Sequence, residues 1–69
     1  MFPSEYIQYG VYKIQNYEVW IYRDRWNYIR VSCQGQVKDA YWSGPYLIVT
    51  LQSGQIRRYF DHIRYEIVG

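Results

Sequence analysis

Few residues of this chain have side chains suited to catalysis. The 69 residues include one cysteine, Cys33, and one histidine, His62. His62 follows Asp61, but neighbouring residues of a strand point to opposite faces of a sheet, which separates this acid from its imidazole. Cys33 has no other histidine with which to form a nucleophile–base couple. We therefore expect no catalytic residues and do not predict an enzyme.

The same counts bear on metals, cofactors and location. One Cys and one His cannot build a structural zinc site, and the five glycines are isolated, without a phosphate-binding loop. We expect no metal and no cofactor. A lone cysteine without an export signal predicts a cytoplasmic protein. No apolar run is longer than the four residues of Tyr46 to Val49, which is too short to span a bilayer, so no membrane association is expected.

One constellation combines cations with aromatic rings. It surrounds the expected turn at residues 24–27 and consists of Arg23, Arg25, Trp26, Tyr28 and Arg30. Arginine binds carboxylates and phosphates in a fixed geometry and stacks on rings, and Tyr, Trp and Arg dominate protein-interface hot spots. Single-strand nucleic-acid binders use the same combination, with bases stacked on rings.

Charge favours the first of these two interpretations. The net charge is only +2 and the sequence pI is near 8.8, below what a dedicated DNA binder carries. Asp24 also lies inside the cluster. We therefore predict a binding module for a protein partner and keep single-stranded nucleic acid as the alternative.

The elements that must position this cluster are short strands. Aromatic residues make up 22% of the chain, and turn residues interrupt the β-branched and aromatic runs at short intervals. The runs are Tyr6–Tyr9, Val11–Gln15, Tyr17–Arg23, Tyr28–Cys33, Val37–Ser43, Tyr46–Gln52, Gln55–Phe60 and Arg64–Val68. The connections are too short for parallel crossovers. Single helical turns could form at Ser4–Ile7 and, capped by Asp61, at residues 62–64.

These runs predict an all-β fold in one domain, residues 1–69. We expect an antiparallel meander of five to seven short strands, rolled into a barrel or half-barrel. Size and strand count are similar to those of small SH3-like and Sm-like barrels, in architecture only, and no family motif is identified. A chain this short builds a modest core, which favours self-association.

A hairpin with its tip at residues 24–27 sorts side chains onto two faces. It places Trp20 opposite Val31 and Tyr22 opposite Ile29, and directly opposed residues share a face. That face, with Cys33, is assigned to the core. The other face and the tip form the predicted partner-binding surface, which comprises Tyr17, Ile21, Arg23, Arg25, Trp26, Tyr28 and Arg30.

Turns at Gly44-Pro45 and Ser53-Gly54 sort the second half of the chain. They place Trp42 opposite Leu47, Ala40 opposite Val49 and Lys38 opposite Leu51. They also set Val49 opposite Arg58 and Leu47 opposite Phe60. A bulge at Gly54 would turn Arg58 outward but would turn Ile56 and Phe60 outward too, so the unbulged register is preferred. The expected core is Trp20, Val31, Trp42, Leu47, Val49 and Leu51.

The outer face of this second half is not polar. It should carry a self-association surface made of Tyr41, Tyr46, Ile48 and Tyr59. We expect a homo-oligomer, most simply a two-fold dimer. In the alternative, the N-terminal segment Phe2 to Ile14 covers this face and the protein is a monomer.

Overall fold

A computed structural model describes residues 2–33 and 36–69 and shows one short helix and seven strands. The elements in chain order are α1 (Ser4–Tyr9), β1 (Tyr12–Gln15), β2 (Glu18–Tyr22), β3 (Tyr28–Val31), β4 (Val37–Ser43), β5 (Tyr46–Leu51), β6 (Ile56–Tyr59) and β7 (Tyr65–Ile67). The predicted all-β character is confirmed. In the part of the chain that the structure describes, no helix is long and apolar enough to cross a membrane.

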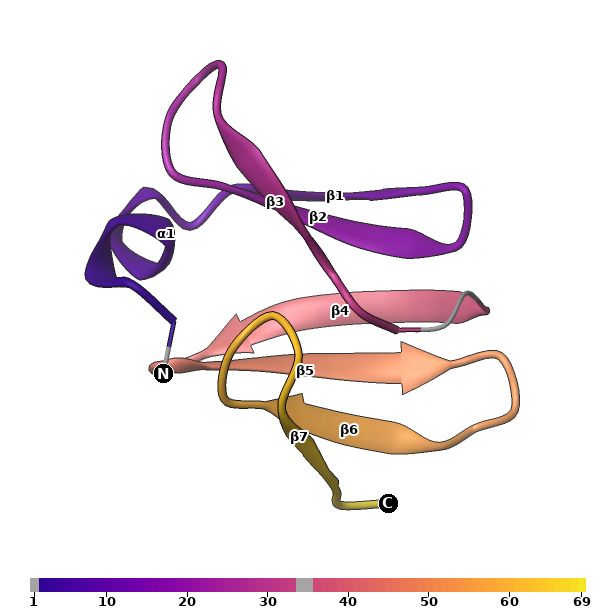
Figure 1. Cartoon of the computed structure of the whole chain (residues 1–69). Coiled ribbons are helices and arrows are strands. Elements are labelled where there is room, and N and C mark those ends of the chain that lie inside the picture. Colours follow the sequence, from indigo (N-terminus) through magenta and orange to yellow (C-terminus); the bar gives the residue numbers. More distant parts are fainter. Residues whose placement is uncertain (1, 34–35) are drawn as a thin grey trace.

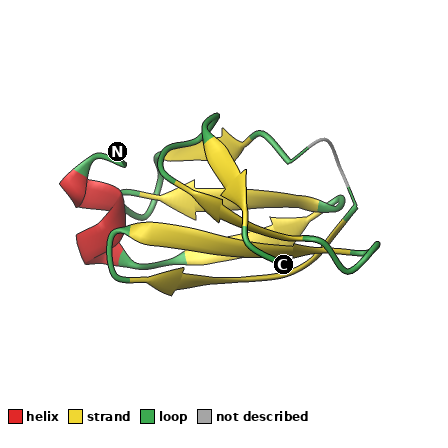
Figure 2. Ribbon diagram, turned by 90° about the horizontal axis from the view of Figure 1, so that it is seen from below, coloured by secondary structure: helices red, strands yellow, loops and turns green. Residues whose placement is uncertain are grey.

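The strands form two antiparallel sheets (Figure 1). The three-stranded sheet has the order β1-β2-β3, and the four-stranded sheet has the order β4-β5-β6-β7. Every pairing joins strands that are consecutive in the chain, as a meander requires. No closed barrel is found among the described strands; Figure 2 shows the two sheets from below, with the helix at one end.

The N-terminal segment packs on the core. Helix α1 ends at Gly10, whose φ of 69° is left-handed and whose N–H donates to the Tyr6 carbonyl. Tyr6 and Phe2 are buried, and the Phe2 ring meets Trp42 edge-on at 5.2 Å. The first run, Tyr6–Tyr9, is therefore helical and not a strand. The alternative in which this segment covers the outer face is wrong, because Tyr41 stays 53% exposed.

The first hairpin of the four-stranded sheet largely follows its predicted register. Trp42 lies opposite Leu47 and Ala40 opposite Val49, as expected for a two-residue turn at Gly44-Pro45. The predicted pair of Lys38 with Leu51 is wrong. A bulge between Val37 and Asp39 gives that place to Val37, which is buried, whereas Lys38 is exposed.

The next hairpin has the bulged register, so the predicted unbulged register is wrong. Leu47 lies opposite Tyr59 and Val49 opposite Arg57. The Leu51 N–H donates to the Gln55 carbonyl, so the loop has three residues and ends at Gly54, with φ of 94°. Because this loop has three residues and not the predicted two, the register of β6 differs by one residue from the prediction. Its side chains therefore lie on the opposite faces from those predicted.

Tyr59 and Arg57 thus point into the core. Tyr59 is fully buried and its hydroxyl donates to the Ser32 carbonyl at 2.8 Å, linking β6 to the end of β3. Arg57 donates to the Tyr59 hydroxyl at 3.2 Å and to the Gln55 side chain at 2.7 Å, and its guanidinium carbon lies 4.2 Å from the Tyr65 ring centre. These contacts satisfy polar groups that would otherwise be costly to bury.

The hairpin of β2 and β3 is also shifted by one residue from the prediction. Ile21 lies opposite Ile29, and Val19 opposite Val31. Val19 and Ile21 are therefore the buried residues of β2, and Trp20 faces outward. Four predicted core residues, Val31, Leu47, Val49 and Leu51, are buried, and Trp42 packs against them half-buried. The assignment of Trp20 to the core is wrong.

Candidate partner-binding face

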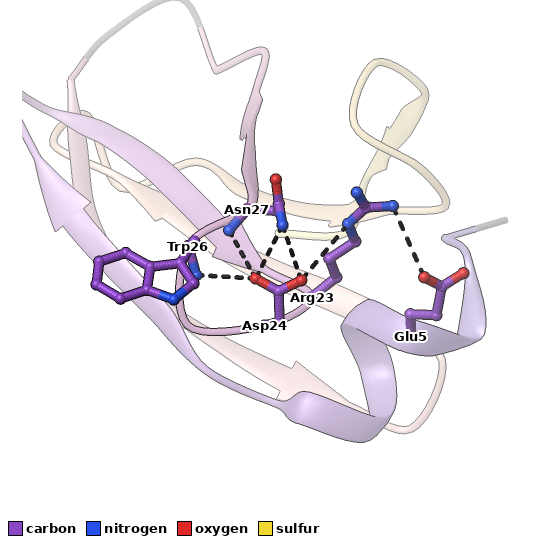
Figure 3. Close-up of polar contacts among 5 residues, drawn as sticks. All are labelled: Glu5, Arg23, Asp24, Trp26 and Asn27. Carbon is purple, nitrogen blue, oxygen red and sulfur yellow. Dashed lines mark hydrogen bonds and ion pairs between the residues drawn. The ribbon is translucent and has the colours of Figure 1, made fainter.

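The loop between β2 and β3 causes the register shift. Residues 23–27 separate Tyr22 from Tyr28, and the Arg23 N–H donates to the Asn27 carbonyl at 3.1 Å. The Asp24 carboxylate accepts the backbone N–H groups of Trp26 and Asn27, each at 2.8 Å (Figure 3). Hydrogen bonds from the Asn27 side chain and from the Trp26 backbone hold the pKa of Asp24 below its usual range. An acidic turn therefore shapes the tip of a basic hairpin.

The shift gathers five side chains on the outer face of the three-stranded sheet, and we call them the aromatic–cation ladder. They are Lys13, Trp20, Tyr22, Tyr28 and Arg30. Lys13, Trp20 and Arg30 share one cross-strand row, and Tyr22 and Tyr28 share the next. Trp20, Tyr22 and Lys13 are surface residues that were not predicted from the sequence.

The rings of the ladder stack on one another. Trp20 and Tyr28 are parallel within 3°, with ring centres 4.7 Å apart. Tyr22 meets Tyr28 at 5.4 Å with a tilt of 41°. The Arg30 guanidinium carbon lies 5.3 Å from the Trp20 ring centre, and the Lys13 ammonium lies 5.6 Å from the Tyr22 ring centre. Each cation is thus held by a ring quadrupole, which prepositions it at the surface.

The cations of this region differ in their ionic partners. Arg23 has two weak, solvent-exposed ion pairs, with Glu5 at 3.8 Å and with Asp24 at 4.0 Å (Figure 3). Within the described residues, Lys13, Arg25 and Arg30 have no ion pair. These three positive charges are available to an acidic partner.

The tip adds an exposed ring, as predicted. Trp26 is 80% exposed, and the Arg25 guanidinium carbon lies 5.8 Å from its ring centre. Tyr28 is 40% exposed, and Arg23, Arg25 and Arg30 are exposed too. Ile21 is fully buried, so its assignment to the partner-binding surface is wrong; the register shift exchanged it with Tyr22. Tyr17 is exposed at the β1–β2 turn, apart from the ladder.

The predicted self-association surface is only partly on the outside. Tyr41, Tyr46 and Ile48 lie on the outer face of the four-stranded sheet, but Tyr59 is buried, so its place in that surface is wrong. There the Arg58 guanidinium carbon lies 5.1 Å from the Tyr46 ring centre, and the same guanidinium bonds the Glu66 carboxylate. This cation is neutralised, unlike those of the ladder.

The residues considered for catalysis have other contacts. The Asp61 carboxylate accepts the backbone N–H groups of Arg64 and Ile63, which lower its pKa and shape a turn without a helix. Cys33 is buried, and that burial raises the pKa of its thiol. In the described parts of the chain, no three His, Cys, Asp or Glu side chains lie close enough to hold a metal ion.

Comparison with protein families, curated proteins and solved structures found no match for this chain. Function is therefore inferred from the face alone.

Proposed function

We propose that the protein is a non-catalytic interaction module that binds a protein partner through the aromatic–cation ladder and the neighbouring tip. The observation that carries this proposal is the parallel stack of Trp20 on Tyr28, with Arg30 over the Trp20 ring, on an outer sheet face. Side chains fixed by stacking lose little conformational entropy when a partner binds, which favours affinity.

The composition and charge of the ladder indicate the partner. Trp, Tyr and Arg are the residue types enriched in interface hot spots. Trp20 and Tyr28 stack face to face, so one face of each ring is already used. Because Lys13 and Arg30 have no acidic neighbour among the described residues, the face suits a protein surface with carboxylates and apolar groups.

Other contacts support the non-catalytic part of the proposal. The Asp61 carboxylate is engaged in a turn, and the Cys33 thiol is buried with a raised pKa. A cytoplasmic location stays a prediction from the single cysteine. We further propose that the two sheets form an open half-barrel. Two backbone hydrogen bonds support this, from the Ser32 N–H to the His62 carbonyl and from the Val37 N–H to the Tyr17 carbonyl.

Single-stranded nucleic acid is the second candidate, favoured by the tip alone. Trp26 is the most exposed large apolar side chain of the described residues, and Arg25 lies beside its ring. A base could stack there while Arg25 contacts a phosphate. Counterion release would make such binding fall steeply as salt rises.

Panning a random-peptide display library against the protein tests the first proposal. We expect the selected peptides to be acidic and to bind the Tyr28→Ala variant at least about fivefold more weakly than wild type, a loss of about 1 kcal/mol that most interface residues do not reach. Tyr46→Ala is the matched control, since this tyrosine also lies on an outer sheet face and contacts another ring, that of Phe60. Selected peptides that bind Tyr28→Ala unchanged would contradict the proposal.

A fluorescent single-stranded oligonucleotide tests the second candidate. Binding at low salt that weakens at moderate salt and on Trp26→Ala would favour nucleic acid and contradict the protein-partner proposal. No binding at low salt would exclude the nucleic-acid candidate.

A further inference from the structure

The β3 strand has a free edge, with backbone groups that pair with nothing in the described residues. The bond from the Arg23 N–H to the Asn27 carbonyl fixes the alternation of hydrogen bonds between β2 and β3. Ile29 then exchanges hydrogen bonds with Ile21, and the backbone groups of Tyr28 and Arg30 point away from β2. Ser32 confirms this direction, because its N–H points the same way and donates to the His62 carbonyl.

We propose that two copies of this chain pair through the free edges of β3, antiparallel about a two-fold axis at Ile29, to form one six-stranded sheet. In this register, Tyr28 of one copy lies opposite Arg30 of the other, and the two such pairs exchange four backbone hydrogen bonds across the axis. The proposal goes beyond the proposed function, because it rests on the strand edge and its register.

Side chains on both faces are complementary in that register. On the outer face, each Tyr28 ring meets the Arg30 guanidinium of the other copy, a favourable cation–π pair. On the inner face, half-buried Ile29 meets Ile29 at the axis, where cross-strand side chains are closest. The two aromatic–cation ladders join into one continuous face that crosses the dimer.

The other edges do not offer this complementarity. In β1, the bond from the Tyr22 N–H to the Val11 carbonyl implies that the backbone groups of Lys13 point toward β2 and that those of its two neighbours point outward. A two-fold axis between these two neighbours would set Lys13 of one copy against Lys13 of the other. In β7, the Phe60–Arg64 and Val68–Ile56 bonds place Glu66 at the equivalent position, and Glu66 would meet Glu66. Like charges directly opposed destabilise a sheet.

The edge of β4 is partly occupied. The Val37 N–H donates to the Tyr17 carbonyl, and β4 contacts β1 and β2. Among these edges, β3 alone presents an uncharged residue at the axis and a ring opposite a cation on either side of it. A second copy is thus the occupant that this edge fits.

The ends of the proposed pairing bring exposed apolar groups together. The strand pair ends where the His62 carbonyl takes the Ser32 N–H. Three residues from the axis, Trp26 of one copy comes beside Ser32 and the 61–64 turn of the other copy. Trp26 is 80% exposed and Ile63 of that turn is 60% exposed, and the contact would shield both from water.

Charge complementation tests the register. Sedimentation of the wild-type protein at high micromolar concentration should give twice the 8.5 kDa chain mass. Tyr28→Lys places a lysine against Arg30 of the other copy and should give the 8.5 kDa monomer. An equimolar mixture with Arg30→Glu should restore a dimer, since the introduced lysine of one variant then meets the introduced glutamate of the other. A wild-type monomer, or a Tyr28→Lys dimer of unchanged affinity, would overturn the proposal.

Disulfide trapping tests the axis without touching the ladder. Ile29→Cys, in a Cys33→Ala background, brings two Cα atoms to about 4.5 Å, the spacing of a non-hydrogen-bonded antiparallel pair, which suits a disulfide. We expect a covalent dimer on mild oxidation, at least tenfold faster than for Tyr41→Cys in the same background. Faster cross-linking at Tyr41 would place the interface on the four-stranded sheet and overturn the proposal. Because Ile29 faces inward, loss of this dimer would leave peptide binding by Tyr28 as a separate result.

Discussion

The two sheets carry similar residues on their outer faces and arrange them differently. On the four-stranded sheet, Arg58 lies over the Tyr46 ring and is paired with Glu66. On the three-stranded sheet, Arg30 lies over the Trp20 ring and has no acid beside it in the described residues. The positive charge of Arg58 is therefore balanced by Glu66, whereas the positive charge of Arg30 has no balancing carboxylate among the described residues.

The turns of the two sheets also differ, in which residues occupy the positions of positive φ. The turns of the four-stranded sheet place glycine where φ is positive, at Gly44 and Gly54. The β1–β2 turn of the three-stranded sheet places Asn16 and Tyr17 there, with φ of 52° and 61°. Asparagine adopts this conformation readily, whereas a tyrosine there departs from local preference, and such departures are expected at functional sites. The comparison therefore favours the proposal that the three-stranded sheet binds a partner, and it predicts that the four-stranded sheet contributes more to stability.

The largest predicted effect is on stability, in a comparison of two separate Trp→Ala variants, one on the inner face and one on the outer face. Trp42→Ala removes a ring that packs on the core and on Phe2, and should lower the free energy of unfolding by about 3 kcal/mol. Trp20→Ala removes the Tyr28 stack and the Arg30 contact, and should cost about 1–2 kcal/mol. Urea denaturation of both variants measures the difference.

Binding gives the opposite order. Peptides selected on the ladder should lose affinity for Trp20→Ala and keep it for folded Trp42→Ala, measured below its denaturation midpoint. Equal stability losses, or a larger loss for Trp20→Ala, would remove the assignment of stability to the four-stranded sheet.

A smaller effect is expected at Tyr59, which ties the two sheets together. Tyr59→Phe removes the bond to the Ser32 carbonyl and leaves Arg57 without one acceptor, at a cost of about 1–3 kcal/mol. Tyr46→Phe on the outer face is the control and should cost far less. A Tyr59→Phe variant as stable as wild type would show that packing alone joins the sheets.

Alkaline pH should act through the same residue. Burial raises the pKa of Tyr59 above its ordinary value of about 10. The folded state then keeps a proton that the unfolded state loses, so the contribution of Tyr59 to stability is complete below about pH 10 and declines above it. Burial of the Cys33 thiol raises its pKa and acts in the same direction from a lower pH. Denaturation at a series of pH values should show a shallower alkaline decline in Tyr59→Phe.

The four-stranded sheet could be predicted more closely from the sequence than the three-stranded one. Its first strand, Val37–Ser43, has the predicted bounds, and the two-residue Gly44-Pro45 turn fixed the pairing of Trp42 with Leu47. The glycine at position 54 was compatible with a bulge. The register was predicted wrongly because Ile56 and Phe60 were expected to face the core. The burial of Tyr59 depends on partners distant in the chain, Ser32 among them, which no local pattern reveals.

The three-stranded sheet was harder because both faces of β2 are hydrophobic. Val19 and Ile21 alternate with Trp20 and Tyr22, so alternation could not choose the buried pair. Whether the tip loop has an odd or an even number of residues decides which pair is buried. The hydrogen bonds between Asp24 and Asn27 fix a loop of five residues, and these bonds depend on the three-dimensional shape of the turn. Matching aliphatic Val19 and Ile21 with aliphatic Val31 and Ile29 would have found the register and, with it, the ladder.

The smallest effect, and the one of opposite sign, is expected at Tyr17. A tyrosine with a φ of 61° is strained by its Cβ, and Tyr17→Gly should raise the free energy of unfolding by up to about 1 kcal/mol, less what glycine adds to the entropy of the unfolded chain. Gly44→Ala, at a φ of 58° in the four-stranded sheet, reverses the change and should destabilise.

The Tyr17 variant also sharpens the comparison between the sheets. Tyr17 is 61% exposed, and the sequence placed it on the partner-binding surface. If a partner contacts it, Tyr17→Gly will be more stable and bind selected peptides more weakly, which explains why strain is tolerated there. If the variant is more stable and binds equally well, the contact surface ends at the ladder and the tip, and Tyr17 lies outside it.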